Sequence, residues 1–330
     1  MLKSYLEKLS PTKKYFLETA LNLGVKINVL SDRYHLLELN YKNKTTLIIN
    51  EELFFNQKIG TLFSKNKEVT KILLSKEGIS VAKGFVAVNY EEAVLGMKKN
   101  KINFPVVVKP IDAARGIGVT VGVDNLKKLK TAISRLNNAI KECDMRCSGE
   151  FLIEEMFYGS DYRILVLNNK VIACYGRVPA FVVGDGKSSI EKLVNDFNST
   201  RSSHFKIKID DEIKDTLKEK KLNSDSILKK DFRLQLRLNA NISTGGIAVD
   251  MTEKISPYFK NIAIKCAKAL QLNFCGVDIM ADDLSLKKEN QKYCIIEVNG
   301  SPNIGIFTEK EVYPGDGKKV IETIVKEVLK

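Results

Sequence analysis

The sequence predicts an α+β fold made of more than one compact lobe, and three observations lead to this prediction. The chain has 330 residues, of which 44% are hydrophobic and 28% charged, which is typical of a soluble globular protein with two or three lobes. Apolar residues recur at helical spacing in residues 126–140, whereas they alternate with polar ones in residues 162–167 and 170–177. The intervening Asn168-Asn169 is typical of a tight turn between antiparallel strands.

Residues 1–64 are predicted to form a small N-terminal α/β segment. Ser10-Pro11 is typical of a helix start, and Gly24 of its end. Residues 26–30, 36–41 and 45–49 then have the character of short strands joined by polar turns. The segment carries no set of acids, bases or metal ligands, so its sequence does not indicate a role.

Residues 65–150 are predicted to form a second lobe and residues 151–330 a third, larger one. In the second lobe we expect helices over 65–74, 90–99 and 126–140, the last capped by Asp124, and strands over 79–88, 105–109 and 118–123 in a βαβ-like order. In the third lobe we expect strands over 151–155, 162–167, 170–177, 232–238, 274–280 and 293–298, with helices over 189–198, 257–270 and 317–330. The polar, charge-dense segment 199–230 is expected to be an exposed excursion.

The composition excludes several classes of protein. The formal net charge of +13 favours anionic partners such as nucleotides or acidic peptides, but the scattered lysines and the lack of tryptophan argue against nucleic acid. The apolar runs are too short to cross a membrane, and the first residues lack the apolar core of a signal peptide. The six cysteines have no framework spacing, which indicates reduced thiols in the cytoplasm. Cys143 and Cys147 are spaced like half of a metal knuckle, but no second ligand pair follows them.

Lys109 is the first candidate for binding an anion. It follows three valines at the end of a predicted buried strand, where an ammonium group is costly unless an anion meets it. The loop over residues 111–118 comes next, and its small residues would let backbone N–H groups fold over phosphates. A lysine in solvent at the end of an edge strand is the alternative interpretation.

Asp278, Glu297 and Asn299 form the strongest local signal for a metal site. Glu297 and Asn299 share one face of a predicted strand because side chains alternate with a period of two, and Asp278 lies in a strand of similar character. Three oxygen ligands without histidine or cysteine favour magnesium or manganese over zinc. A buried cluster of this kind with no cation is the structural alternative, and it would carry uncompensated charge.

Acids and arginines between these elements are candidates for contacting a nucleotide. Glu154 and Glu155 end an apolar strand, a setting that suits an adenine ring and its amino group, although solvent-facing acids are the alternative. Asp161, a few residues further on, is a candidate for binding ribose hydroxyls. Arg177 and Arg237 are candidates for stabilising charge on a transferred phosphoryl group.

These motifs, in this order, resemble the ATP-grasp ligases of the type found in cyanophycin synthetase and in the ATP-grasp part of bifunctional glutathione synthetase. The resemblance runs from about Lys65 to Ser301. It is carried by the segments 66–71, 108–110, 160–163, 177–180, 183–190, 238–246 and 297–299. The sequence shows neither the glutamate–cysteine ligase part nor the Mur-ligase-like part of those relatives, and its loop 112–116 has less glycine than many of them. These departures leave the substrate open.

The resemblance implies an ATP-grasp fold in which two α+β lobes clamp ATP. It implies that Lys67 and Lys109 hold phosphates and that Asp161 holds the ribose. Glu154 and the backbone from Glu155 to Phe157 would hold the adenine. Two Mg²⁺ ions, or Mn²⁺ in their place, would be held by Asp278, Glu297 and Asn299.

The predicted function is therefore an ADP-forming carboxylate–amine ligase that makes an amide or peptide bond through an acyl phosphate. Its substrates would be amino acids or short peptides, gripped by Arg163, Arg177 and Arg237, and the resemblance implies a homodimer or tetramer. Two alternatives remain at this point. One is an ATP-grasp kinase that stops at a phosphoester, and the other is a non-catalytic nucleotide-binding module.

Overall fold

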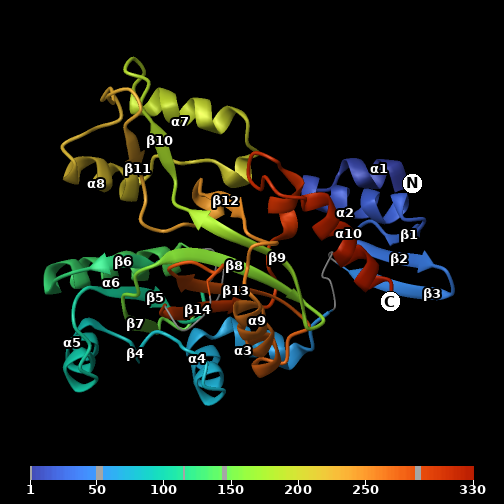
Figure 1. Cartoon of the computed structure of the whole chain (residues 1–330), viewed down its shortest axis with the longest axis horizontal. Coiled ribbons are helices and arrows are strands. Elements are labelled where there is room, and N and C mark those ends of the chain that lie inside the picture. Colours follow the sequence, from blue (N-terminus) through green and yellow to red (C-terminus); the bar gives the residue numbers. More distant parts are fainter. Residues whose placement is uncertain (1, 50–54, 114–115, 143–146, 287–290) are drawn as a thin grey trace.

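The computed structural model describes residues 2–49, 55–113, 116–142, 147–286 and 291–330 (Figure 1). The helices are α1 (Leu2–Glu7), α2 (Pro11–Asn22), α3 (Lys58–Lys65), α4 (Lys67–Lys76), α5 (Tyr90–Lys99), α6 (Leu126–Lys141), α7 (Ile190–Ser199), α8 (Asp211–Glu219), α9 (Pro257–Ala269) and α10 (Gly317–Val328), with short 3₁₀ helices η1 (Ser203–Phe205), η2 (Ile242–Thr244) and η4 (Ile304–Thr308). The strands are β1 (Lys26–Ser31), β2 (Leu36–Tyr41), β3 (Lys44–Ile49), β4 (Gly84–Ala87), β5 (Val106–Pro110), β6 (Thr120–Val123), β7 (Phe151–Glu155), β8 (Ser160–Leu167), β9 (Lys170–Val178), β10 (Phe181–Val183), β11 (Arg233–Gln235), β12 (Ile247–Asp250), β13 (Phe274–Ala281) and β14 (Tyr293–Asn299). The predicted α+β class is confirmed. None of the helices within these ranges is both long and apolar enough to span a membrane.

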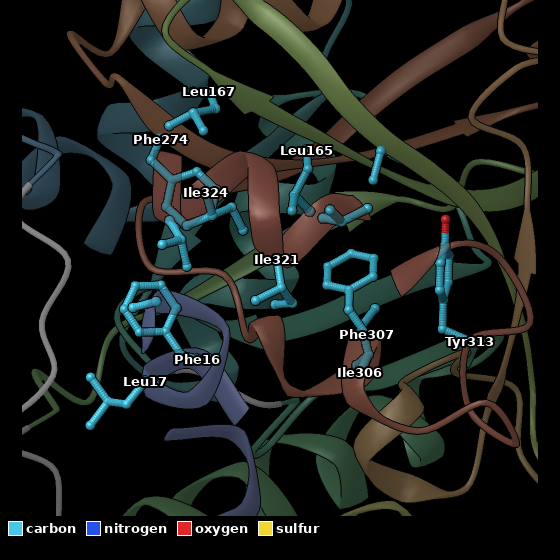
Figure 2. Close-up of a cluster of buried hydrophobic side chains, with 14 of the residues drawn as sticks. Phe16, Leu17, Leu165, Leu167, Phe274, Ile306, Phe307, Tyr313, Ile321 and Ile324 are labelled. Carbon is cyan, nitrogen blue, oxygen red and sulfur yellow. The ribbon is translucent and has the colours of Figure 1, made fainter. Parts of the chain in front are cut away.

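The N-terminal segment shares a hydrophobic core with the last helix. Strands β1, β2 and β3 form a three-stranded antiparallel sheet, as predicted. In Figure 2, Phe16 and Leu17 of α2 lie close to Ile321 and Ile324 of α10, and the same core continues to β8, β13 and η4. The blue N-terminal and red C-terminal ends of the chain therefore lie side by side in Figure 1.

A four-stranded sheet with the order β4-β7-β5-β6 forms the smaller lobe. Helices α5 and α6 supply apolar residues to its core, among them Met97, Leu129 and Leu136. The βαβ-like order is present in β4, α5 and β5, whose strands run parallel, but β7 pairs antiparallel with both strands and lies between them. Strand β7 also lies beyond residue 150, so the predicted boundary after that residue falls just before one of this sheet's own strands. The cap of α6 is Asn125 rather than Asp124, since the Asn125 side chain accepts from the Lys128 N–H.

A five-stranded sheet with the order β12-β9-β8-β13-β14 forms the centre of the larger lobe, and all its pairings are antiparallel. Helix α9 packs against β8, β9 and β13, and its core includes Phe259, Ile262 and Cys266. The predicted hairpin at Asn168-Asn169 is confirmed, because both residues have positive φ, as this turn requires. Strands β10 and β12, of three and four residues, were not predicted.

The sequence predicted that segment 199–230 is an exposed excursion, and this prediction is wrong for part of the segment. Phe205, Ile207, Ile213, Leu217 and Leu228 are buried. Most of them share a core with β10, β11 and α7. Charged residues surround these apolar positions in the sequence, so the amphipathic pattern of α8 was hidden. Helix α8 also contacts the smaller lobe, where the Arg135 guanidinium of α6 lies 2.5 Å from the Asp215 carboxylate.

Gly245 is a point where the backbone requires glycine, and it supplies a stability prediction. Its φ is +94°, and an added Cβ would lie 2.2 Å from Cγ1 of Ile207. Gly24 has a similar φ of +84° but open space around it. We expect Gly24→Ala to reduce the free energy of unfolding by about 1 kcal/mol, from backbone strain alone. Gly245→Ala should reduce it by about 2–4 kcal/mol, because overpacking adds to the strain. Urea unfolding measures both values, and an equal loss of unfolding free energy in Gly24→Ala and Gly245→Ala would contradict this explanation.

Candidate functional site

Glu154 lies between two lysines in the smaller lobe. Lys109 Nζ at the end of β5 is 2.7 Å from Glu154 Oε2, and Lys71 Nζ of α4 is 2.7 Å from Glu154 Oε1. The side chains of Lys109 and Glu154 are only 5% and 4% exposed. Burial alone would raise the Glu154 pKa, but the two lysines outweigh it and lower the pKa below its usual value. Both oxygens of this carboxylate therefore accept from a lysine.

Lys67 is buried, as Lys109 is. It opens α4 directly after Asn66, whose side chain accepts from the N–H groups of Glu68 and Val69. The Lys67 amine donates to the Ala113 carbonyl at 2.5 Å. Burial lowers the Lys67 pKa, and repulsion from Lys109 lowers it further, against a partial opposing attraction from Glu297, Asp112 and Glu154. An N-terminal helix turn and buried lysines together make this region attractive to a polyanion.

The two sequence stretches that carry the strongest predictions meet here. The Lys109 amine donates to the Ile296 carbonyl of β14 at 3.3 Å, directly before Glu297. The lobes are also joined close by, where the Ile295 N–H donates to the Ser80 carbonyl at 2.9 Å. Lys109 and Glu297, which are 188 positions apart in the sequence, are thus near enough to face one ligand.

The three predicted metal ligands lie on adjacent strands of the larger lobe. Asp278 of β13 pairs in register with Glu297 of β14, and Gly276 pairs with Asn299. The Asn299 side-chain oxygen accepts from the Ser301 N–H at 2.9 Å. Among the described residues, no group of three or more histidine, cysteine, aspartate or glutamate side chains could hold a metal ion. The set is instead two carboxylates and one amide, a donor chemistry that fits magnesium.

Two arginines form ion pairs with Asp278. Arg163 of β8 donates from Nε to Asp278 Oδ1 at 2.6 Å and from Nη2 to Oδ2 at 2.7 Å. Arg177 of β9 brings Nη2 within 3.0 Å of Asp278 Oδ2. Burial would raise the Asp278 pKa, but the two guanidinium groups outweigh it and lower the pKa. Asp278 therefore neutralises two buried cations in this structure.

Asp161, predicted to contact ribose, is the second acid of the same network. Its Oδ1 accepts from Arg177 Nε at 2.9 Å and from Nη2 at 2.6 Å. Burial raises the Asp161 pKa despite Arg177, and repulsion from Asp278 adds to the rise. Two arginines and two aspartates thus form a compact charge network in which each cation is paired.

Arg237 lies in another cluster. Its guanidinium is 2.5 Å from Asp210 Oδ2, it also pairs with Glu212, and it donates to the Lys208 carbonyl at 3.2 Å. These partners belong to the segment before and at the start of α8. Asn239 joins the cluster by donating to Glu212 Oε1 at 3.2 Å. Within the described residues, the side-chain partners found for Arg237 are acids of this segment and not the network around Asp278.

At the strand end predicted to hold adenine, two backbone N–H groups already form hydrogen bonds with other parts of the chain. The Glu155 N–H donates to the Lys83 carbonyl at 2.9 Å, and the Met156 N–H donates to the Pro105 carbonyl at 3.3 Å. The Glu155 carboxylate lies 4.0 Å from the Lys83 amine, and Phe157 is half-buried. In the small-residue loop, Ala114 and Arg115 lie outside the described residues, as does Cys143 of the cysteine pair.

Lys71 is a site residue that the sequence analysis missed. It follows Lys67 by four positions, so the two side chains lie on the same face of α4. That spacing was the available signal. A further lysine in a chain with 53 Lys and Arg residues does not stand out without knowledge of its acidic partner.

Comparisons with known proteins identify the family of this chain. Residues 64–192 and 207–324 match the RimK-like ATP-grasp domain. The glutathione biosynthesis bifunctional protein GshAB of Clostridium perfringens is 30% identical over 327 residues, which are 97% of this chain and 41% of that protein. Cyanophycin synthetase of Synechocystis is 33% identical over 251 residues, which are 74% of this chain and 28% of that protein.

A solved structure also resembles the whole chain. The crystal structure of a bifunctional glutathione synthetase from Pasteurella multocida superposes with a TM-score of 0.67 and 28% identity, covering 98% of this chain and 44% of that one. The chain thus spans less than half the length of each of these relatives. Because the family match covers most of the chain and the fold agrees over nearly all of it, the chain belongs to the RimK-like ATP-grasp family.

Proposed function

We propose that this protein is an ATP- and Mg²⁺-dependent ligase that joins the carboxylate of an amino acid or short peptide to an amine, forming ADP. The observation that carries the proposal is the pair of buried lysines, Lys67 and Lys109, beside the oxygen donors of β13 and β14. The family assignment supports ATP and Mg²⁺ in general. The relatives named for glutathione biosynthesis and cyanophycin synthesis support an amino-acid or peptide substrate.

In this proposal the nucleotide binds between the two lobes. Lys67 and Lys109 contact phosphates, Glu154 accepts from the adenine amino group, and Asp161 accepts from the ribose. The backbone from Glu155 to Phe157 flanks the base. Lys109 has to leave Glu154 to reach a phosphate, and a triphosphate supplies the negative charge that compensates for the lost ion pair.

The larger lobe supplies oxygen donors for the metal. Asp278, Glu297 and Asn299 would hold two Mg²⁺ ions, or Mn²⁺ in their place, and Asp278 becomes available when its arginines turn to an anionic substrate. Bound Mg²⁺ would neutralise phosphate charge so that a second anion can approach. Arg163, Arg177 and Arg237 then grip the substrate carboxylate and the phosphoryl group.

The reaction proceeds by two displacements. The substrate carboxylate oxygen attacks the γ-phosphorus, the bond to ADP breaks, and an acyl phosphate forms. The amine then attacks the carbonyl carbon, loses a proton and displaces inorganic phosphate. No protein nucleophile is required, which agrees with the buried thiols: burial raises the pKa of Cys275 and of Cys294 to about 12 and keeps both protonated.

The test is an assay with ATP, Mg²⁺, single amino acids or dipeptides, and hydroxylamine. A ligase gives ADP together with an acyl hydroxamate. A stable phosphoester in place of the hydroxamate would show a kinase, and nucleotide binding without turnover of any candidate acid would show a binding module. Sedimentation of the purified protein checks the dimer or tetramer, which the resemblance implies. Fractionation of cells checks the cytoplasmic location, which the unpaired spacing of the cysteines indicates.

A pH prediction follows from Lys67. Burial and Lys109 lower its pKa below the usual lysine value, although Glu297, Asp112 and Glu154 oppose the shift. Only the ammonium form attracts phosphate, so MgATP affinity is full below the lowered pKa and is lost as pH rises through it. We expect Lys67→Arg to move this alkaline loss to higher pH, because guanidinium stays charged. Isothermal titration from pH 7 to 10 measures the MgATP affinity of both proteins. If wild type and Lys67→Arg lose affinity at the same pH, the role of Lys67 is contradicted.

A further inference from the structure

The Glu154 carboxylate is held in place by two lysines and by the backbone of a neighbouring strand. Lys71 and Lys109 each approach one of its oxygens at 2.7 Å. Gly84 of β4 closes the third side: a Cβ there would lie 2.9 Å from Glu154 Cγ and 3.1 Å from Lys71 Nζ. The Lys71–Glu154 pair therefore has a fixed geometry set by three elements, α4, β4 and β7.

The two lysines have different surroundings. Lys109 also donates to the Ile296 carbonyl, which turns it toward β14 and the metal ligands. Lys71 has a side chain that is 14% exposed and pairs with the oxygen of Glu154 opposite to that of Lys109. A phosphate chain between the lobes would therefore draw Lys109 away and leave Lys71 in place. Glu154 Oε2 then becomes free for a ligand while Oε1 keeps a cation.

We propose that Lys71 is a positioning residue for base recognition, which holds Glu154 ionised and oriented toward an adenine amino group once Lys109 has moved to the phosphates. This inference rests on the proposed function and adds the coupling between base and phosphate binding. A buried carboxylate with no cation would take up a proton, and its O–H would then donate instead of accept. Adenine presents an amino donor where guanine presents a carbonyl acceptor, so the ionisation of Glu154 decides between the two bases.

The experiment compares Lys71→Met and Lys71→Arg with Lys76→Met, a change at an exposed lysine on the same helix. Dissociation constants are measured by isothermal titration for MgATP, MgGTP and magnesium tripolyphosphate, the last of which has no base. We expect Lys71→Met to weaken MgATP binding roughly 10- to 100-fold, as for a lost charge-assisted hydrogen bond. Tripolyphosphate affinity should stay unchanged, so the preference for ATP over GTP falls. Lys71→Arg should keep most of that preference, and Lys76→Met all of it.

A double-mutant cycle guards against a merely structural role. Glu154→Gln leaves a neutral oxygen acceptor that needs no cation, so adding Lys71→Met to this variant should change MgATP affinity little. The double variant has no unpaired buried charge left from the Lys71–Glu154 pair. It can therefore be compared with Glu154→Gln alone even if Lys71→Met by itself does not fold.

Several results would overturn the inference. These are equal losses of ATP and tripolyphosphate affinity in Lys71→Met, an unchanged preference between ATP and GTP, or an undiminished effect of Lys71→Met in the Glu154→Gln background. A wild-type protein that binds tripolyphosphate but binds MgATP and MgGTP equally well would overturn the inference too. The proposed binding of phosphates would then still stand. A wild-type protein that binds neither MgATP nor tripolyphosphate would instead overturn the proposed function.

Discussion

Asp278→Asn is expected to lose both activity and stability, because one carboxylate serves two purposes. Activity in the hydroxamate assay should fall by about 10³-fold or more, since a metal ligand is lost. The free energy of unfolding should fall by about 3–5 kcal/mol, because Arg163 and Arg177 would remain buried without their shared anion. The Asp278 pKa is lowered in the folded protein, so this stabilisation is present above the unfolded-state pKa. The difference between wild type and variant should therefore shrink as pH falls through the folded-state pKa.

Glu297→Gln is the matched control, because Glu297 faces Asp278 across the β13–β14 pair and is only half-buried. We expect a similar loss of activity but a change in the free energy of unfolding within about 1 kcal/mol of wild type. Urea unfolding and initial rates at saturating ATP measure the two quantities separately. If Asp278→Asn proved as stable as Glu297→Gln, the arginines would not depend on Asp278, and the proposed exchange of cations at this carboxylate would be wrong.

The sequence was most informative where a pattern is local. Periodicity predicted α6, α9 and the hairpin of β8 and β9, and period two placed Glu297 and Asn299 on one face of β14. The strand order was not predictable in the same way. β7 lies between β4 and β5, and β8 pairs with β13 as well as with β9, so several neighbours in the sheets are far apart in the chain.

The partners of the charged residues were the part that sequence reasoning could not supply. Lys71 and Glu154 are 83 positions apart, and Arg163 and Asp278 are 115 apart. Each pair depends on how a helix packs on a sheet or on the register between two strands, and a one-residue shift in register would turn the side chains to opposite faces. The candidate residues of the proposed nucleotide site, apart from Lys71, were thus named from the sequence, but their ion-pair partners were not.

Lys109→Met and Lys67→Met should both lose MgATP binding, about 100-fold or more, because each removes a buried ammonium that would meet a phosphate. Their effects on stability should differ. Lys109 pairs with Glu154 in a buried site, and its loss should reduce the free energy of unfolding by about 2–4 kcal/mol. Lys67 donates to a carbonyl, and its lowered pKa shows that the folded protein disfavours its charge. Lys67→Met should therefore be within about 1 kcal/mol of wild type, or more stable.

The contrast between these two lysines tests whether bound MgATP compensates the charges of Lys67 and Lys109. If that is so, MgATP at a concentration that just saturates the wild type should raise its unfolding temperature clearly more than that of either variant, since the stabilisation depends on the ratio of ligand concentration to dissociation constant. Lys67→Met should start at or above the wild-type value without nucleotide and fall below it with nucleotide. Two variants that are destabilised equally in the absence of ATP would contradict this difference, because Lys67 would then contribute to folding and not only to binding the nucleotide.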